Sequence, residues 1–357
     1  MKFLKNHHRL AVMALCFILT LSTLLLPGCG RISAIAHFPA FKEMENVRVK
    51  YACDVILEKA EKAKEEFPFI EQVITDYQVA LQDPEVDAVY VLTPNHSHYT
   101  VAMDALRAGK HVFCEKPIDH DLTKIKQVVE ALKGSNIKYQ VGFNRRHDHN
   151  FAAVKQAVVD GKVGDVHIIK ITSRDPEPPS AEYAAVSGGM FLDMTIHDFD
   201  MVRFLAGCDA EEIYVQSAVL VDPAIGEAGD VDTAIITLKM ENGAIAVIDN
   251  SRRAAYGYDQ RAEVFGSKGM VATANDTLST AVLSNAEGVT GEKPLYFFLE
   301  RYMQSFATEV KGFISAIEND TDTLVGVEDG LKPVLMGIAA KKSVLEHRPV
   351  KLSEIEY

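Results

Sequence analysis

The sequence predicts an α/β protein in which an N-terminal doubly wound parallel sheet precedes an α+β domain with a large, mostly antiparallel open sheet. Two observations support this prediction. Between residues 21 and 144, short apolar runs alternate with helical patterns, as in repeated βα units. After residue 144 the strand patterns lengthen and hairpin signals join them, most clearly at Asn242 and Gly243. We therefore expect a first domain over 21–144 and a second over 145–357.

The elements of the first domain follow from its apolar runs and the residues that interrupt them. The segment "STLLLP" is the only candidate for a first strand. The near-continuous apolar run 86–94 is typical of a strand covered on both faces, while Gly109 ends a helix and Pro117 ends a strand. We expect strands over 21–27, 47–54, 86–94, 111–117 and 138–146, and helices over 31–41, 56–67, 98–109 and 121–133.

In the second domain the strand patterns are longer, and the Asn-Gly dipeptide predicts that one of them folds back as a hairpin. We expect strands over 166–175, 212–222, 233–254 and 261–273, with helices near 190–205, 297–318 and 327–346.

Composition limits the class of protein. A chain of 357 residues is long enough to build two cores. Its formal net charge of −13 argues against binding to nucleic acid or to an anionic membrane surface. The five cysteines form no Cys-x-x-Cys pair, which favours reduced thiols in the cytoplasm over a disulfide framework or a zinc site.

The N-terminus points in another direction. Lys2, Lys5 and Arg9 precede a long apolar run that ends near Cys29, as in an export signal or a lipoprotein leader. We interpret residues 1–20 as a signal-like or anomalous extension. We expect the following segment to be retained, because cleavage before Cys29 would remove the first strand. Export with membrane anchoring is the alternative to a cytoplasmic location.

The first strand leads into a candidate dinucleotide turn. Gly28 would make the tight turn, and Gly30 would let the backbone approach a pyrophosphate at the helix N-terminus. Asp54 ends the next strand 24 residues after Gly30, near the spacing expected for a carboxylate on the ribose. Val55 follows it, and no basic residue stands there for a 2′-phosphate, so we expect NAD.

Two other strand ends carry polar residues. Lys116 follows strand 111–114 at the ligand edge of the sheet, where it could stabilise a developing alkoxide, although surface exposure is the commoner fate of a lysine. The loop "TPNHSHY" (93–99) should lie along the cofactor. His96 and His98 could bind a metal, but a polar turn capping the next helix is the better explanation, and we predict no metal.

The segment "GGMFLDMTIHDFDMVRFL" places Asp193 and His197 four residues apart, on one face of a predicted helix. A carboxylate that orients a histidine is a typical general base, while a buried structural histidine is the competing interpretation, which this segment alone favours. A zinc site is disfavoured because no third ligand is evident. The same face also carries Met190, Met194, Met201 and Phe204.

Together these motifs resemble the family of glucose–fructose oxidoreductase, inositol dehydrogenase and rhizopine-catabolism proteins. The resemblance covers nearly the whole chain from residue 28. It rests on GCGRI, the strand ending in Asp54, TPNHSH, EKP, GFNRRHD and SGGMFLDMTIHDFDM. Within the family the chain is most similar to inositol dehydrogenases, through GFNRRHD (142–148), SRDPEPPSAEY (173–183) and YGYDQRAEVFG (256–266).

The resemblance implies the role of each site residue. Lys116 would contact the reacting hydroxyl, His197 would be the catalytic base, and Asp193 would hold substrate and assist both. Arg145, Asp175 and Tyr258 would line a polyol pocket. The implied cofactor-binding residues are Gly28, Gly30, Arg31, Ile32, Asp54, Thr93, Pro94, Asn95, His98, Glu115 and Lys116.

The implied reaction is NAD-dependent oxidation of myo-inositol to 2-keto-myo-inositol. The first alternative is a dehydrogenase of the same family acting on scyllo-inositol or on an aldose such as glucose. An exported sugar-binding lipoprotein and a non-catalytic NAD sensor are further alternatives, but an intact set of Lys116, Asp193 and His197 argues against both. Members of the family are often tetramers, so we also expect a homotetramer.

Overall fold

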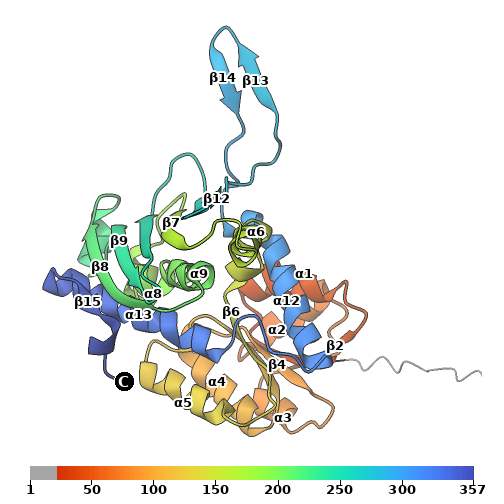
Figure 1. The fold of residues 1–357 in the computed structure, drawn as a ribbon. Coiled ribbons are helices and arrows are strands. Elements are labelled where there is room, and N and C mark those ends of the chain that lie inside the picture. Colours follow the sequence, from red (N-terminus) through yellow and green to blue (C-terminus); the bar gives the residue numbers. More distant parts are fainter. Residues whose placement is uncertain (1–21) are drawn as a thin grey trace, which may run out of the picture.

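The computed structural model describes residues 22–357, so the interpretation of residues 1–20 lies outside the described residues. The described chain forms two large sheets with helices packed against them (Figure 1). Among these residues, no helix is long and apolar enough to cross a membrane.

The first sheet has six strands, all parallel, in the order β3-β2-β1-β4-β5-β6. The order reverses at β1, and in a doubly wound sheet this reversal opens a crevice at the carboxyl ends of the strands. The strands are β1 (Ser22–Pro27), β2 (Val47–Cys53), β3 (Gln72–Ile74), β4 (Ala88–Val91), β5 (His111–Glu115) and β6 (Tyr139–Gly142). The helices are η1 (Ser33–His37), α1 (Phe38–Phe41), α2 (Leu57–Glu66), α3 (Tyr77–Leu81), α4 (Asn95–Arg107) and α5 (Leu122–Leu132).

Strand β1 occupies the centre of this sheet, which confirms the predicted first strand. Leu24, Leu25 and Leu26 are fully buried between β2 and β4. Pro27 is the last residue of the strand, and its carbonyl accepts a hydrogen bond from the Leu92 backbone N–H at 2.9 Å. At this position the missing N–H of proline costs little, because the ladder ends there.

The second sheet has seven strands in the order β12-β11-β7-β10-β9-β8-β15. Only the β7–β10 pair is parallel, so the sheet is mostly antiparallel, as predicted. The predicted strand 233–254 is a hairpin that turns at Asn242 and Gly243, where Gly243 has a φ of +86°. The strands are β7 (Val166–Arg174), β8 (Ala210–Ala218), β9 (Thr233–Met240), β10 (Ile245–Ser251), β11 (Asp259–Gly266), β12 (Gly269–Ala272) and β15 (Val350–Lys351).

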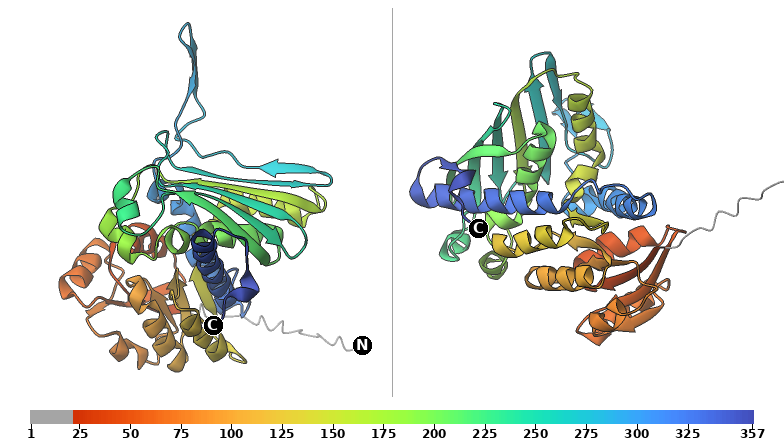
Figure 2. Two further views of the ribbon diagram at one scale, coloured as in Figure 1. Left: turned by 90° about the vertical axis from the view of Figure 1, so that its left-hand side faces the viewer. Right: turned by 60° about the horizontal axis from the view of Figure 1, so that its bottom comes forward.

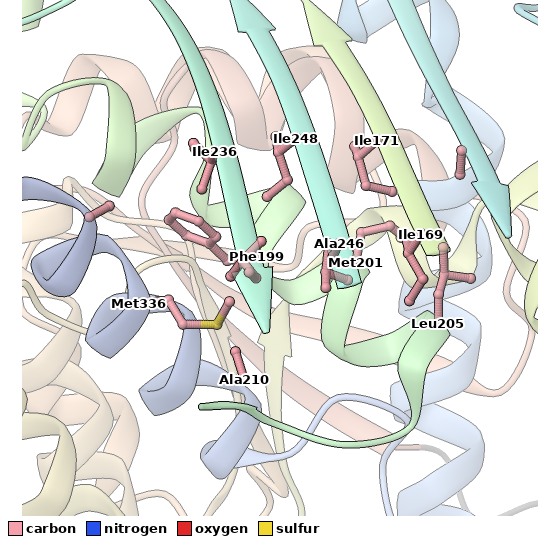
Figure 3. Close-up of a cluster of buried hydrophobic side chains, with 14 of the residues drawn as sticks. Ile169, Ile171, Phe199, Met201, Leu205, Ala210, Ile236, Ala246, Ile248 and Met336 are labelled. Carbon is pink, nitrogen blue, oxygen red and sulfur yellow. The ribbon is translucent and has the colours of Figure 1, made fainter. Parts of the chain in front are cut away.

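In the part of the chain that the structure describes, helices cover one face of the second sheet and leave the other open, as both views of Figure 2 show. Phe199 and Met201 of α9 (Ile196–Ala206) pack beneath Ile248 of β10, and Met336 of α13 (Val327–Glu346) closes the same core (Figure 3). The alternation of buried and exposed residues along β9 and β10 follows from this one-sided cover.

The last two long helices also pack against the first domain. Val310 and Phe313 of α12 (Met303–Glu318) share a core with Leu24 and Leu26 of β1. Leu331, Val334 and Leu335 of α13 belong to the core on the other side of the first sheet. The C-terminal helices therefore join the two sheets into one body.

The helix predicted over 190–205 is broken. It consists of α8 (Met190–Asp193) and α9, with Met194 and Thr195 between them. The Thr195 hydroxyl donates a hydrogen bond of 2.6 Å to the side chain of Asn250 on β10. This bond between side chains ties the break to the sheet. Asp193 and His197 consequently do not share the face of one regular helix.

Several short or exposed elements were not predicted. The hairpin β13 (Val282–Asn285) with β14 (Gly288–Gly291) stands away from both sheets in Figure 1. The predicted helix 297–318 is interrupted at Tyr302, giving α11 (Phe298–Arg301) and α12. The remaining elements are η2 (Asn144–His147), α6 (His149–Val159), α7 (Ala181–Val186), α10 (Pro223–Glu227) and η3 (Leu352–Glu354).

Candidate active site

A cavity of about 700 Å³ is lined by strand ends of both large sheets and by the segments that connect them. Most of the residues predicted to bind cofactor or substrate line it. They are Arg31, Ile32, Thr93, Asn95, His98, Glu115, Lys116, Arg145, Asp175, Asp193, His197 and Tyr258. Of the other predicted residues, Gly28, Gly30 and Asp54 lie at the ends of β1 and β2, and Pro94 is exposed beside Thr93.

The glycine turn after β1 fits a dinucleotide. Gly28 has a φ of +98°, and a Cβ on it would lie 2.4 Å from the carbonyl oxygen of Leu92, so only glycine is accommodated there. A Cβ on Gly30 would have no atom of the described chain within 4 Å, which leaves the turn open to a ligand. Asp54 accepts a hydrogen bond of 3.0 Å from the Cys29 N–H and thereby holds the turn against β2.

Further features of this end agree with NAD. The second carboxylate oxygen of Asp54 accepts from the Ile56 N–H at 3.0 Å, and each oxygen keeps a further lone pair for a ribose hydroxyl. Val55 is 86% exposed and presents no positive charge for a 2′-phosphate.

The loop after β4 is tied to the strand end of β5. The His98 ring lies between two carbonyl oxygens, with Nδ1 2.8 Å from Pro117 O and Nε2 2.6 Å from Thr93 O. Among residues 22–357, no side chain forms a cap hydrogen bond at the N-terminus of α4, whose N-cap is Pro94, so the capping interpretation of this loop was wrong. His98 instead fastens the loop to the segment that carries Glu115 and Lys116.

Lys116 reaches across the cavity to α8. Its ammonium donates a hydrogen bond of 2.9 Å to the backbone carbonyl of Asp193 and lies 3.6 Å from that residue's Oδ1. Tyr183 donates to the same Oδ1 at 3.1 Å, and Arg252 donates to Oδ2 at 3.2 Å. Burial by itself raises the pKa of Asp193, but the charges of Lys116 and Arg252 outweigh it and hold the pKa below its ordinary value.

His197 is held as a neutral imidazole. Burial, followed by the positive charges of Lys116 and Arg145, lowers its pKa well below the ordinary value. Among the described residues its Nδ1 has no hydrogen-bond partner, and no bond joins it to Asp193. The expectation that Asp193 orients the histidine was therefore wrong: the helix break gives Asp193 other partners. A neutral imidazole that lines the cavity can accept a proton.

The opposite wall combines charged and hydroxyl groups. Arg145 donates a hydrogen bond of 2.6 Å to Asp198 and approaches the Tyr258 hydroxyl at 3.5 Å. Asp175 accepts a bond of 3.2 Å from Arg252, and burial raises the pKa of Asp175 to about 6 even though Arg252 and Arg145 oppose this rise. This wall offers both donors and acceptors, as a ligand with several hydroxyls requires.

Two residues that bond to Asp193 were not predicted from the sequence. Arg252 lies at the end of β10 and bonds to both Asp175 and Asp193, while Tyr183 comes from the short helix α7. The arginine pair near the end of the predicted strand 233–254 was the available signal for Arg252. Tyr183 lies within the motif 173–183, but nothing in the sequence indicates its hydrogen bond to Asp193.

Comparisons with known proteins identify the family of the chain. The family model "Oxidoreductase family, NAD-binding Rossmann fold" matches residues 23–143, and "GFO/IDH/MocA C-terminal domain" matches residues 151–272. A relative from Thermotoga maritima named myo-inositol 2-dehydrogenase is 45% identical over 328 residues, covering 92% of this chain and 98% of its own length.

Solved structures give the same result. The crystal structure of a probable dehydrogenase from Thermotoga maritima superposes with a TM-score of 0.90 at 44% identity, covering 93% of this chain and all of its own. The scyllo-inositol dehydrogenase of Lactobacillus casei, solved with bound NAD(H) and scyllo-inositol, has a TM-score of 0.85 at 30% identity over 93% of this chain and 99% of its own. The chain therefore belongs to the GFO/IDH/MocA family of oxidoreductases and carries its NAD-binding Rossmann domain.

Proposed function

We propose that this protein oxidises myo-inositol to 2-keto-myo-inositol with reduction of NAD, and that Lys116, Asp193 and His197 form its catalytic site. The observation that carries the proposal is the convergence of these three side chains on one cavity beside the strand ends of the NAD-binding domain. The name of the Thermotoga relative supports inositol as the substrate.

In the proposed mechanism His197, neutral and lining the cavity, accepts the proton of the reacting hydroxyl. The ammonium of Lys116 donates a hydrogen bond to the same oxygen and stabilises the developing alkoxide. NAD, when bound, supplies the acceptor for the hydride of the carbinol carbon. Asp193 orients Lys116 through the contacts described above.

The remaining residues hold the two ligands. Arg145, Asp175 and Tyr258 bind hydroxyls of the polyol and align its reacting carbon. The glycine turn and Asp54 hold the dinucleotide phosphates and ribose. The cofactor is further held by Arg31, Ile32, Thr93, Pro94, Asn95, His98 and Glu115.

An assay of NAD reduction at 340 nm tests the proposal. We expect turnover with myo-inositol, and its absence with every inositol would contradict the proposal. Scyllo-inositol and glucose belong in the same panel, because the Lactobacillus casei structure is that of a scyllo-inositol dehydrogenase. A preference for either would assign the first alternative.

We further propose a division into an NAD domain over 21–144 and a substrate domain over 145–357, a cytoplasmic location and a homotetramer. The uncovered face of the second sheet supports self-association, because Ile235, Ile245 and Met270 are exposed there. Sedimentation of the purified protein tests the tetramer. Intact mass of the natively expressed protein tests the location, since loss of 28 residues with a lipid on Cys29 would indicate export.

A further inference from the structure

Arg252 occupies its position because two strands end together. β10 and β7 run parallel, and their last residues, Ser251 and Arg174, are paired. The next residue of each strand, Arg252 and Asp175, therefore leaves the sheet at the same level. A hydrogen bond of 2.9 Å from the Asp175 N–H to the Ser251 carbonyl fixes this arrangement.

The guanidinium of Arg252 bridges two carboxylates that come from distant parts of the chain. Nη1 donates to Asp175 Oδ2 and Nη2 donates to Asp193 Oδ2, each at 3.2 Å. The Arg252 side chain is only 5% exposed, and the residue lines the cavity. A planar group with two divergent donors suits this bridge, whereas a lysine ammonium offers a single point of charge.

The pKa values of the two carboxylates are shifted in opposite directions. Burial and the charge of Asp193 raise the pKa of Asp175 to about 6, whereas the pKa of Asp193 stays below its ordinary value. Two buried carboxylates near one another do not both stay ionised unless a positive charge compensates them. The charged and titratable groups that face Asp175 are Arg252, Arg145, Asp193, Tyr183 and Tyr258.

We propose that Arg252 is a positioning residue of the polyol site: it bridges Asp175 and Asp193, keeps both carboxylates ionised, and aims them at substrate hydroxyls. Arg252 thus joins the substrate wall at Asp175 to the catalytic residue Asp193. Because two carboxylates already balance the charge of this guanidinium, the site favours an uncharged polyol over a sugar acid. The inference rests on the function proposed above.

The test compares Arg252→Met with Arg252→Lys, and Arg253→Met is the matched control. Arg253 is the exposed neighbour of Arg252 and does not line the cavity. The first readout is a carbon-13 NMR titration of the Asp175 carboxyl in the NADH-bound protein. The carboxyl signal is assigned by its disappearance in Asp175→Asn. The second is kcat/KM for myo-inositol between pH 6 and 9.

In Arg252→Met we expect Asp175 to bind its proton at least about tenfold more tightly, because the nearest positive charge is gone. At pH 7, kcat/KM should fall at least about tenfold, mainly through KM, and the deficit should shrink toward pH 9 as Asp175 ionises again. Arg252→Lys should restore the titration but keep KM raised a few-fold, because it cannot span both carboxylates. Arg253→Met should match the wild type in both measurements.

An unchanged Asp175 titration in Arg252→Met would overturn the inference. A loss of activity that is equal at every pH and is not relieved in Arg252→Lys would overturn it too, because it would indicate a packing defect. If Arg252→Met does not fold, Arg252→Gln takes its place in both measurements. Failure of the wild type to oxidise any polyol would contradict the proposed function, while the Asp175 titration would still decide the role of Arg252.

Discussion

The two halves of the cavity are built in different ways. On the cofactor side, the turn at Gly28, the carboxylate of Asp54 and the loop at Thr93 each follow a strand of one parallel sheet. Backbone groups form important contacts there, such as the hydrogen bonds from the Cys29 and Ile56 N–H groups to the Asp54 carboxylate. On the substrate side, by contrast, charged side chains from separate elements hold one another in place.

This difference predicts which mutations each half of the cavity tolerates. The cofactor half depends on backbone conformation and should be sensitive to any added Cβ that meets a neighbouring strand. The substrate half depends on burial and on single charges. Burial, with the charges of Lys116 and Arg145, lowers the pKa of His197, and Arg145 also pairs with Asp198. Mutations of the two kinds should therefore be distinguishable: the first lowers stability and NAD affinity, and the second lowers turnover.

The largest effect is expected from removing β1. A chain that begins at Cys29 lacks the buried residues Leu24, Leu25 and Leu26 between β2 and β4, so the cofactor half should not form. Circular dichroism and NADH fluorescence should show neither a cooperative unfolding transition nor binding. A chain that begins at Leu21 keeps the strand and is the control. NADH binding by the shorter chain would show that the cofactor half forms without β1, which would contradict this prediction.

The next largest effect is expected in the substrate half. His197→Ala should lower kcat by about 10²–10⁴-fold, because the general base is lost. The NADH affinity and the melting temperature should stay close to those of the wild type. His96→Ala, an exposed histidine that does not line the cavity, is the matched control and should retain turnover. A near-normal kcat in His197→Ala would contradict the assignment of His197 as the general base.

A third test separates the two glycines of the turn. Gly28→Ala should cost at least about 1–3 kcal/mol of unfolding free energy, because its φ is +98° and the Cβ would lie 2.4 Å from Leu92 O. Gly30→Ala meets no such obstacle and should change stability by less than about 0.5 kcal/mol, while weakening NADH binding. Denaturant unfolding and NADH titration of both variants measure the difference. An equal loss of unfolding free energy in the two variants would contradict the inferred clash between a Cβ at Gly28 and the Leu92 carbonyl oxygen.

The smallest effect is expected from pH. His197, whose pKa is well below the ordinary value, stays neutral through pH 6, whereas Asp175, with a pKa of about 6, becomes protonated below that pH. The kcat/KM for myo-inositol should therefore fall by up to about tenfold per pH unit below pH 6. Asp175→Asn should have a lower value without this acid limb. A limb near pH 6.5 that persists in Asp175→Asn would assign an ordinary pKa to His197.

Much of the cofactor half was predictable because its signals are local. The first strand STLLLP, the glycine turn and the spacing to Asp54 each depend on neighbouring residues. The capping interpretation of the loop at Thr93 failed because His98 bonds instead to Pro117, 19 residues away. The roles assigned to Lys116 and His197 stay proposals, although both side chains line one cavity.

Local pattern was thus sufficient for the fold class and the central first strand, because hydrophobic period and chain-breaking residues act within a few positions. It was not sufficient for every strand end, since the predicted strand 261–273 is the pair β11 and β12. Tertiary contacts alone decided the partners of Asp193 and the place of Arg252. The first depends on a helix that breaks where Thr195 bonds to Asn250, and the second on two parallel strands, 77 residues apart in sequence, that end together. Such pairings arise only when elements pack, so helical spacing alone assigned Asp193 the wrong neighbour.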